Sequence, residues 1–524
     1  MTGRPGFESV GLAELIAALS LGIDLGFGQP MEHVVRQCLI AVRLAERMGL
    51  DENVRSVVYY TALLTNVGCH TDAHEQAKWF GDDIGLKGDK YVYGLHGARA
   101  TLAGLRRLGA GHPVLHRFRI GLNFALSGHR ELDGMVARHS AMAQSLAAEI
   151  GLPEAVQAAV GASYEQWNGK GWPGALEGEA IPIAARVSQL AEFVEVAHRS
   201  GGVDAAVALA RRLGGSQFDP SIAASFAAAA AEILGDIDGT SAWNDVIAAE
   251  PTLARPLSPD ELDSALAAIA DFVDLKSPFM LGHACGVAEL VDGAGPHVGL
   301  DAAAARLLHR AALAQGFGRL GVSNAIWDKH GALGAGEWER VRLHPYLTGR
   351  MLQQSVALNP IGVLAAQVRE RLDGSGYPRG LAGGAIATAA RVLGVADAYQ
   401  SMVEPRPHRP PHAPDAAAGE LRAEVRAGRL DDEAVEAVLV SAGHRSMARR
   451  LRPAGLTARE VDVLRLVARG FSSKDIAAEL VISVKTARNH IQHIYAKTGV
   501  TNRVAASVFA TEHGLLAPST TSAD

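Results

Sequence analysis

The sequence predicts an all-α protein with two tandem helical domains followed by a small four-helix domain. Apolar residues recur at helical spacing through Ala- and Leu-rich stretches, and turns that contain Gly and Pro interrupt these stretches. One set of residue spacings in the first half of the chain is repeated in the second half. The chain has 524 residues, of which 48% are hydrophobic and 20% charged, and this length is enough for about three folded domains.

The tandem duplication follows from intervals between acidic residues and histidines. The shared intervals are nine residues (Asp24 to His33, Asp274 to His283), 32 residues (His33 to Thr65, His283 to Gln315), 26 residues (His139 to Glu165, His344 to Glu370) and 27 residues (Glu165 to Glu192, Glu370 to Asp397). Matching Gly- and Pro-containing turns follow at 167–173 and 372–378. We therefore expect a duplication over residues 8–236 and 258–441, with extra length in the first copy after Thr65.

The second copy resembles the HD-GYP family over nearly its full length. The residues that carry the resemblance are Leu-Gly-His at 281–283, Arg-Leu-Gly-Val at 319–322, His-Pro at 344–345, Glu-Arg-Leu-Asp-Gly-Ser-Gly-Tyr-Pro at 370–378 and Val-Ala-Asp-Ala-Tyr at 395–399. The resemblance implies a helical domain whose active members hold iron-type metals with histidines and aspartates and hydrolyse cyclic di-GMP.

Both copies depart from this family at the metal-binding positions. Gln315-Gly316 and Thr65-Asn66 stand where the family has its His-Asp dyad, and Val368-Arg369 and Ser163-Tyr164 stand where it has two adjacent histidines. A hydrolytic two-metal site needs converging imidazoles and carboxylates. We therefore predict that the chain is not an enzyme, with no catalytic residue and no cofactor.

The remaining metal-capable residues allow two interpretations. They are His283, His344, Glu370 and Asp397 in the second copy and His33 and His139 in the first copy, the latter two accompanied by Glu165 and Glu192. A buried histidine beside a carboxylate is a common hydrogen-bonded core pair, and the alternative is a remnant that binds one metal ion or a ligand. The run Cys-His-Thr-Asp-Ala-His-Glu at 69–75 is a further candidate metal segment.

The rest of the composition indicates a cytoplasmic protein without a membrane span. Cys38, Cys69 and Cys285 are too few and too scattered for a disulfide framework, and the apolar run at 222–231 is about half of a bilayer span. Residues 442–454 form a basic linker, in which Arg445, Arg449, Arg450 and Arg452 either contact phosphates or are simply solvated.

Residues 455–517 carry four short helical patterns with capping residues. Thr457 and Glu460 form a capping box, Ser472 or Ser473 suits the start of a second helix, Ser483 that of a third and Thr501 that of a fourth. Gly470 and Gly499 suit helix ends. In the third helix, Ala487, Ile491, Ile494 and Tyr495 are expected to face inward.

The face opposite this apolar stripe is basic and predicts DNA binding. No acidic residue occurs between Glu479 and Glu512, which is what a phosphate backbone requires of a docked helix. The candidate DNA-binding residues are Lys474, Ser483, Lys485, Thr486, Arg488, Asn489, His490 and Lys497. The alternative is a small helical domain with a solvated basic face.

The same segment resembles the LuxR-type helix-turn-helix family through L-T-x-R-E-x-x-V-L, G-x-S-x-K-x-I-A-x-x-L, S-x-K-T-x-x-x-H and K-x-G-V. The resemblance implies that the third helix enters the major groove and that the fourth commonly forms a dimer contact. We expect a transcription regulator in which an inactive HD-GYP-like tandem senses a ligand or dimerises. Its partners are double-stranded DNA, a second copy of the chain and a small-molecule or nucleotide ligand in the N-terminal repeats.

Two other functions are open at this point. The first is a metal-dependent phosphohydrolase of the cyclic-dinucleotide phosphodiesterase type, fused to a DNA-binding domain. The second is a scaffold held together by the tandem repeat, with an idle DNA module.

Overall fold

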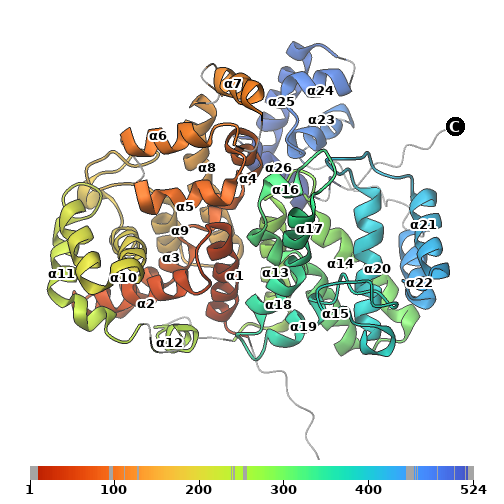
Figure 1. The fold of residues 1–524 in the computed structure, drawn as a ribbon, viewed down its shortest axis with the longest axis horizontal. Coiled ribbons are helices and arrows are strands. Elements are labelled where there is room, and N and C mark those ends of the chain that lie inside the picture. The colour runs from red at the N-terminus through yellow and green to blue at the C-terminus, as the bar shows by residue number, and fades with distance from the viewer. Residues whose placement is uncertain are drawn as a thin grey trace, which may run out of the picture. The chain divides into compact units, whose positions relative to one another are not determined.

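A computed structural model of the chain is helical throughout the part that it describes, namely residues 10–93, 98–110, 113–124, 126, 129–237, 239, 242–251, 256–443, 454, 456, 458–480, 482–500, 502–513 and 515–516 (Figure 1). Within these residues the only β-type pairings are isolated bridges. The predicted all-α fold class is therefore confirmed. None of the described helices combines the length and the apolar content needed to span a bilayer.

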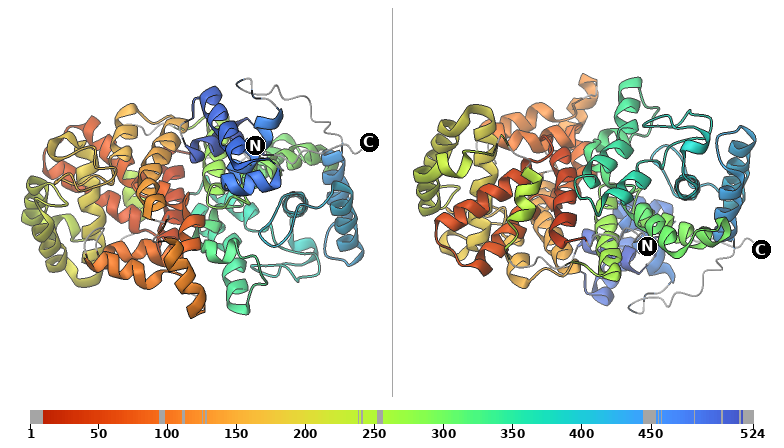
Figure 2. Two further views of the ribbon diagram at one scale, coloured as in Figure 1. Left: turned by 90° about the horizontal axis from the view of Figure 1, so that it is seen from above. Right: turned by 90° about the horizontal axis from the view of Figure 1, so that it is seen from below.

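The chain divides into two compact units. The first consists of residues 1–268, 320–325 and 351–359, and the second of 269–319, 326–350 and 360–524. The first half of the chain contributes α1 (Leu12–Gly26), α2 (His33–Arg47), α3 (Glu52–Leu64), η1 (Val67–His70), α4 (Ala73–Phe80), α5 (Asp83–Tyr93), α6 (Ala98–Arg107), α7 (Val114–Asn123), α8 (His129–Glu149), α9 (Glu154–Gly161), η3 (Gly178–Ala180), α10 (Ile183–Leu213), α11 (Pro220–Leu234) and α12 (Ala242–Ala248). Among these helices, α2, α3 and α10 pack against one another (Figure 2).

The second copy is built from a similar set of helices. They are α13 (Pro259–Asp274), α14 (His283–Ala294), η4 (Gly295–Val298), α15 (Ala302–Ala314), η5 (Phe317–Gly321), α16 (Asn324–Trp327), α17 (Ala335–Arg342), α18 (His344–Leu352), α19 (Asn359–Ala365), η6 (Gly383–Ala385), α20 (Thr388–Val403), α21 (Pro414–Arg426) and α22 (Asp432–Gly443). Helix α14 packs against α15, α20 and α22, which places the start of α14 beside the middle of α20.

Both copies begin their first histidine-bearing helix in the same way. The Oδ1 atom of Asp24 accepts a hydrogen bond of 3.0 Å from the amide of Val34, and the Oδ2 atom of Asp274 accepts one of 2.8 Å from the amide of Ala284. Each aspartate is buried. A carboxylate at the positive end of a helix satisfies an amide that has no partner within the helix. This shared function explains why the nine-residue interval to the histidine occurs twice.

The C-terminal domain forms the expected four helices, α23 (Ala458–Ala468), α24 (Ser473–Glu479), α25 (Val484–Thr498) and α26 (Arg503–Glu512). The hydroxyl of Ser472 caps α24, and that of Ser483 caps α25 by accepting from the amide of Thr486 at 3.0 Å. Gly470 and Gly499 end helices with φ of +83° and +75°, a region that favours glycine.

Some expected features of this domain differ or fall outside the described residues. Asn502, and not the predicted Thr501, caps α26, because its side-chain oxygen accepts from the amide of Ala505 at 2.8 Å. Thr457, Thr501 and the four linker arginines at 445, 449, 450 and 452 lie outside the described residues.

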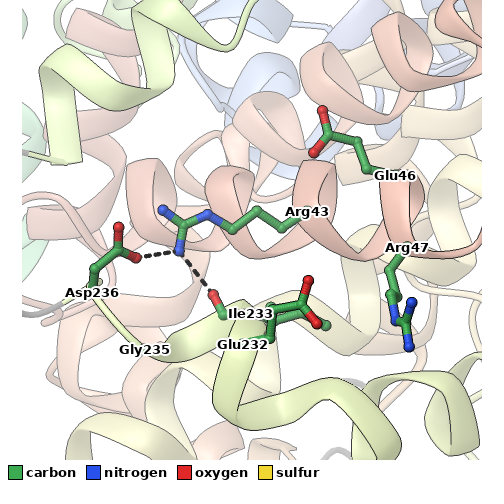
Figure 3. A pocket seen from close by; sticks show the side chains of 7 residues that line it. All are labelled: Arg43, Glu46, Arg47, Glu232, Ile233, Gly235 and Asp236. Carbon is green, nitrogen blue, oxygen red and sulfur yellow. Dashed lines mark hydrogen bonds and ion pairs between the residues drawn. The ribbon is translucent and has the colours of Figure 1, made fainter.

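One surface hollow of the first unit explains how α11 is held to α2 (Figure 3). It has a volume of about 730 Å³, and Arg43 crosses it to donate to the carbonyl oxygen of Ile233 at 2.9 Å and to Asp236 at 2.6 Å. A cation at a helix C-terminus satisfies carbonyls that lack an intrahelical partner. We assign this hollow a structural role, since Arg43 crosses it to pair with Asp236 and to satisfy a carbonyl at the end of α11.

Candidate DNA interface and ligand sites

The candidate DNA interface is the exposed side of α25. Ala487 and Ile494 are buried in the domain core, and Ile491 and Tyr495 pack partly against it, so the predicted inward face is confirmed. The side chains of Lys485, Thr486, Arg488, Asn489 and Gln492 are exposed on the other side of the helix. The helix therefore presents two cations and two polar groups at its amino-terminal half, the half that reads base edges in helix-turn-helix proteins.

The other predicted DNA-binding residues have different surroundings. Lys474 on α24 is exposed, and His490 is partly buried. The ammonium group of Lys497 lies 2.7 Å from the carboxylate of Glu460 on α23. Ser483 caps α25, and its hydroxyl lies 2.7 Å from that of Thr486. These contacts fix the start of α25, which is the part that a DNA groove would meet first.

In the second copy, a buried carboxylate lies among three cationic groups. Asp397 on α20 is fully buried, and its Oδ2 atom lies 2.9 Å from the guanidinium of Arg369. Its Oδ1 atom lies 3.2 Å from Nε2 of His283 and 3.8 Å from the guanidinium of Arg319. Burial raises the pKa of Asp397, but the charges of Arg369 and His283 outweigh burial and hold that pKa well below its usual range.

The two histidines of the second copy differ in charge. Burial lowers the pKa of His283, but Glu404, 2.8 Å from its Nδ1 atom, and Asp397 raise it above the usual value. Burial and the charges of Arg369 and Arg319 lower the pKa of His344 to about 3. The Nδ1 atom of His344 bonds to the carbonyl of Val341 at 2.7 Å, while its buried Nε2 atom has no hydrogen-bond partner among the described residues. His344 is therefore neutral and carries one unused ring nitrogen.

Glu165 and Glu370, which occupy matching positions in the two copies, accept hydrogen bonds from the turns that follow them. Glu370 accepts hydrogen bonds of 2.8 Å from the amides of Arg379 and Leu381, and Glu165 accepts bonds of 2.9 to 3.3 Å from the amides of residues 174–176. With its oxygens bonded to amides, Glu370 acts as the centre of a turn. This geometry disagrees with its interpretation as a vestigial metal ligand.

The first copy also pairs a buried carboxylate with a cationic side chain, but a lysine takes the place of the arginines. Burial raises the pKa of Glu192 on α10, but the ammonium group of Lys90, which lies 2.5 Å away, outweighs burial and lowers it. The amide of Asn66, at the former dyad position, donates to Glu192 at 2.7 Å. His33 bonds through Nδ1 to Glu195, one turn further along α10. In both copies a second carboxylate therefore holds the first histidine.

His139 belongs to a separate chain of contacts in the first copy. Its Nε2 atom lies 2.7 Å from Asp72, and its Nδ1 atom lies 3.5 Å from the sulfur of Cys69, which is 2.6 Å from the hydroxyl of Tyr164. Burial lowers the pKa of His139, but Cys69 and Asp72 raise it to about 9. Burial raises the pKa of Cys69, but the charge of His139 outweighs it and lowers that pKa. Each of these two groups therefore favours the charged form of the other.

These surroundings do not fit the metal ions that the HD-GYP resemblance implies. Guanidinium groups lie against Asp397 in the second copy and an ammonium group lies against Glu192 in the first, at the positions where a cation would bind. Within the described part of the chain, no three His, Cys, Asp or Glu side chains converge in a manner that could hold a metal ion, and this includes the segment 69–75. Buried carboxylates are instead neutralised by side chains of the protein.

Sequence reasoning missed four of the residues at these sites, Lys90, Glu195, Glu404 and Arg406. Glu195 and Glu404 lie one and two turns beyond Glu192 and Asp397, so an acidic residue on the same face of the helix was the available clue. Lys90 lies in the extra length of the first copy, where no counterpart in the second copy points to it. Arg406, whose guanidinium lies 2.9 Å from Glu404, lies in a Pro-rich segment after α20, where none of the repeated intervals points to it.

Comparison with known proteins identifies both parts of the chain. The HD domain family model matches residues 129–222 and 267–434, together half of the chain, and the model of the bacterial regulatory proteins of the luxR family matches residues 454–510. The response regulator VraR of Staphylococcus aureus is 38% identical over 61 residues, which are 12% of this chain and 29% of VraR.

Relatives that match the HD region include phosphodiesterases. The 3'3'-cGAMP-specific phosphodiesterase 3 of Vibrio cholerae is 28% identical over 402 residues, which are 76% of this chain and 87% of that protein. The 3'3'-cGAMP-specific phosphodiesterase 1 of the same organism is 31% identical over 189 residues, 36% of this chain and 44% of its own length. The crystal structure of the V. cholerae cyclic GMP-AMP phosphodiesterase V-cGAP3 shares the fold with a TM-score of 0.59 and 24% identity, over 83% of this chain and 99% of that chain.

The prediction that the chain is not an enzyme is wrong in the light of these relatives. It rests on the dyad positions, Thr65-Asn66 and Gln315-Gly316, whereas the relative that spans most of the chain is a phosphodiesterase. Counting metal ligands at fixed positions leaves out other groups that stabilise phosphate charge, such as guanidinium. The replaced dyad therefore does not decide whether the chain has phosphodiesterase activity.

Proposed function

Because the chain belongs to the HD domain family and ends in a regulatory domain of the luxR family, we propose that it is a transcription regulator whose HD region binds a nucleotide-type ligand and controls DNA binding. The ligand class is proposed from relatives of the HD region, which are named as phosphodiesterases of cyclic GMP-AMP. A protein that binds the chromosome acts in the cytoplasm, where we place the proposed function.

The exposed amino-terminal half of α25 is the observation that carries the DNA-binding part of the proposal. We propose that Lys485, Thr486, Arg488 and Asn489 reach base edges in the major groove, because side chains of these types form hydrogen bonds with base edges there. The remaining predicted residues, Lys474, Ser483, His490 and Lys497, are proposed to contact the phosphate backbone.

We further propose that the DNA-bound form is a homodimer. One helix-turn-helix domain of this size covers only a half-site, and specific binding by such domains uses two copies on a two-fold symmetric sequence. The resemblance of α26 to the dimer-forming helix of the LuxR-type family supports this assignment.

The experiment first maps the genomic sites that the full chain binds, and then measures affinity for one site. Replacing Lys485 and Arg488 together by Ala is expected to weaken specific binding by at least ~30-fold, because each base contact contributes about 1–3 kcal/mol. The matched control replaces Lys170 and Arg422, which lie in the HD region, and removes the same charge. Equal affinities of the two double variants would contradict the DNA-binding proposal.

The regulatory part is tested by adding 3'3'-cGAMP to the full chain on its mapped site. A ligand that controls DNA binding changes the affinity for DNA by about 5-fold or more, because allosteric coupling is typically of this size. An unchanged affinity under saturating ligand would remove ligand control from the proposal and leave DNA binding in place.

A second candidate function is hydrolysis of a cyclic dinucleotide, which the named activity of the relatives favours. Its test is the incubation of full chain with 3'3'-cGAMP, with and without added Mn²⁺ or Fe²⁺, followed by chromatography of the nucleotides. Linear products that appear with the wild type and not with His344→Ala would establish this function.

A further inference from the structure

The two guanidinium groups on Asp397 also form part of the wall of a pocket in the second copy. The pocket has a volume of about 510 Å³, which is within the range of small-molecule sites. Arg319 and Arg369 line it together with Arg406 and Arg409 from the loop after α20. Among the residues that the structure describes around this pocket, five are Lys or Arg and none is Asp or Glu. The pocket therefore presents cations to whatever enters it.

The carboxylates that balance three of these cations, Arg319, Arg369 and Arg406, are buried outside the pocket wall. Asp397 contacts Arg369 and Arg319, and Glu404 lies 2.9 Å from the guanidinium of Arg406. None of these carboxylates lines the pocket. Pairing with a carboxylate keeps these arginines charged and fixed in position. The Nε atom of Arg369 has no hydrogen-bond partner among the described residues and is a candidate donor to a ligand.

Another part of the pocket wall is aromatic and apolar. Phe279, Trp327 and Trp338 line the pocket, and the indole of Trp338 is 44% exposed. The indole nitrogen of Trp327 is buried without a hydrogen-bond partner among the described residues. Aromatic side chains stack on nucleic-acid bases, and an unused indole N–H group is a donor for a base or phosphate oxygen.

We propose that this pocket binds a purine nucleotide without a metal ion, with the phosphate on Arg319, Arg369 and Arg406 and the base against the tryptophans. The inference rests on the proposed function, in which the HD region is the ligand-binding part, and it adds where the ligand lies and what holds it. The arginines supply the positive charge that metal ions supply in a hydrolytic two-metal site. A cyclic dinucleotide and a linear mononucleotide share this phosphate and purine chemistry.

The test is isothermal titration calorimetry of the full chain in buffer with EDTA, using 3'3'-cGAMP in one series and GMP in another. Wild-type protein is expected to bind at least one of them in EDTA, and the stronger one identifies the source of the ligand. Arg369→Leu is expected to weaken binding by about tenfold or more, since hydrogen bonds to charged groups are among the strong ones. Arg422→Leu removes an equal charge from the exposed side of α21 and is expected to bind like the wild type.

A second variant is needed because Arg369→Leu leaves the negative charge of the buried Asp397 with one fewer cationic partner, which can destabilise the fold. Trp327→Phe keeps an aromatic ring but removes the indole N–H group together with one of the two fused rings, so we expect a several-fold loss of nucleotide affinity in a protein that still melts in a cooperative transition. Wild-type affinity in both Arg369→Leu and Trp327→Phe would overturn the assignment of this pocket.

The outcomes separate this inference from the proposed function. Nucleotide binding that appears only with added Mn²⁺ or Fe²⁺ overturns the metal-free pocket alone. Binding of neither nucleotide, with or without metal, by a preparation that still binds its DNA site overturns the pocket and the ligand part of the proposed function, and leaves DNA binding in place. Nucleotide binding in EDTA by a chain that binds no DNA supports the pocket and overturns the regulator.

Discussion

Single residues in the two copies follow one electrostatic plan with different side chains. In each copy a buried carboxylate, Glu192 or Asp397, is paired with a cation of the protein, Lys90 or Arg369. Removing one partner of such a pair leaves an uncompensated buried charge, which costs several kcal/mol. The cations that approach these carboxylates are therefore parts of the fold as well as candidate ligand contacts.

Asp24 gives a prediction at this scale. Burial raises its pKa to about 7 from the ordinary 3.8, so between these values the folded state holds a proton that the unfolded chain releases. The free energy of unfolding then falls as the pH rises through this window. Asp24→Asn removes the ionisable group but keeps a side-chain oxygen that can accept a hydrogen bond from the amide of Val34. We expect the stability of the variant relative to wild type to rise with pH, by at most ~1.4 kcal/mol per pH unit.

Urea unfolding curves of both proteins at several pH values between 4.5 and 8 measure this difference. Asp204→Asn, at an exposed position of α10, removes the same charge from the surface and serves as the control. A stability difference between Asp24→Asn and wild type that stays constant over this pH range would refute the expectation.

The elements of the C-terminal domain are the part of the fold that local sequence predicts well. Serines at 472 and 483 cap α24 and α25, and glycines at 470 and 499 end α23 and α25, because caps and helix ends depend on neighbours within a few residues. The predicted cap of α26, Thr501, lies one residue before the observed cap, Asn502. Both residues carry a suitable side-chain oxygen, so the sequence does not select between them.

The cap of α25 gives a prediction at the scale of an element. Ser483→Ala removes the oxygen that accepts from the amide of Thr486, and loss of an N-cap costs about 1 kcal/mol. Amides in the first turn of α25 are then expected to exchange hydrogen about 5-fold faster in the full chain. Specific DNA binding should weaken as well, since this turn carries the proposed base contacts.

Hydrogen exchange followed by mass spectrometry of peptides from α25 measures the first effect. Ser473→Ala is the control, because Ser473 lies at the first position of α24 and Ser472 is the residue that caps that helix. Equal exchange rates in Ser483→Ala and wild type would show that the cap does not hold this turn.

The whole molecule divides its charge between its parts. Residues 455–517 contain eight Lys or Arg and five Asp or Glu, a net charge of +3, whereas the complete chain has a net charge of −6. Because this domain is positive and the chain as a whole is negative, the phosphate backbone of DNA is attracted to the C-terminal domain. The duplicated HD region supplies the body on which a ligand can act, and coupling of the two activities requires that a ligand favours one state of the complete chain over another.

The sequence by itself determined the helical fold class, the doubled pattern and the basic face of α25, since these depend on periodicity, spacing and local caps. Only the tertiary structure decided which charges meet. His283 and Asp397 are 114 residues apart in the chain, and Glu195 is 162 residues from His33. A buried carboxylate beside a histidine can be neutralised by a metal ion or by a cationic side chain. Which of the two occurs depends on side chains that packing brings from distant segments, here Lys90, Arg319 and Arg369. Neither composition nor the spacing within one copy specifies that arrangement, because the same intervals are compatible with both.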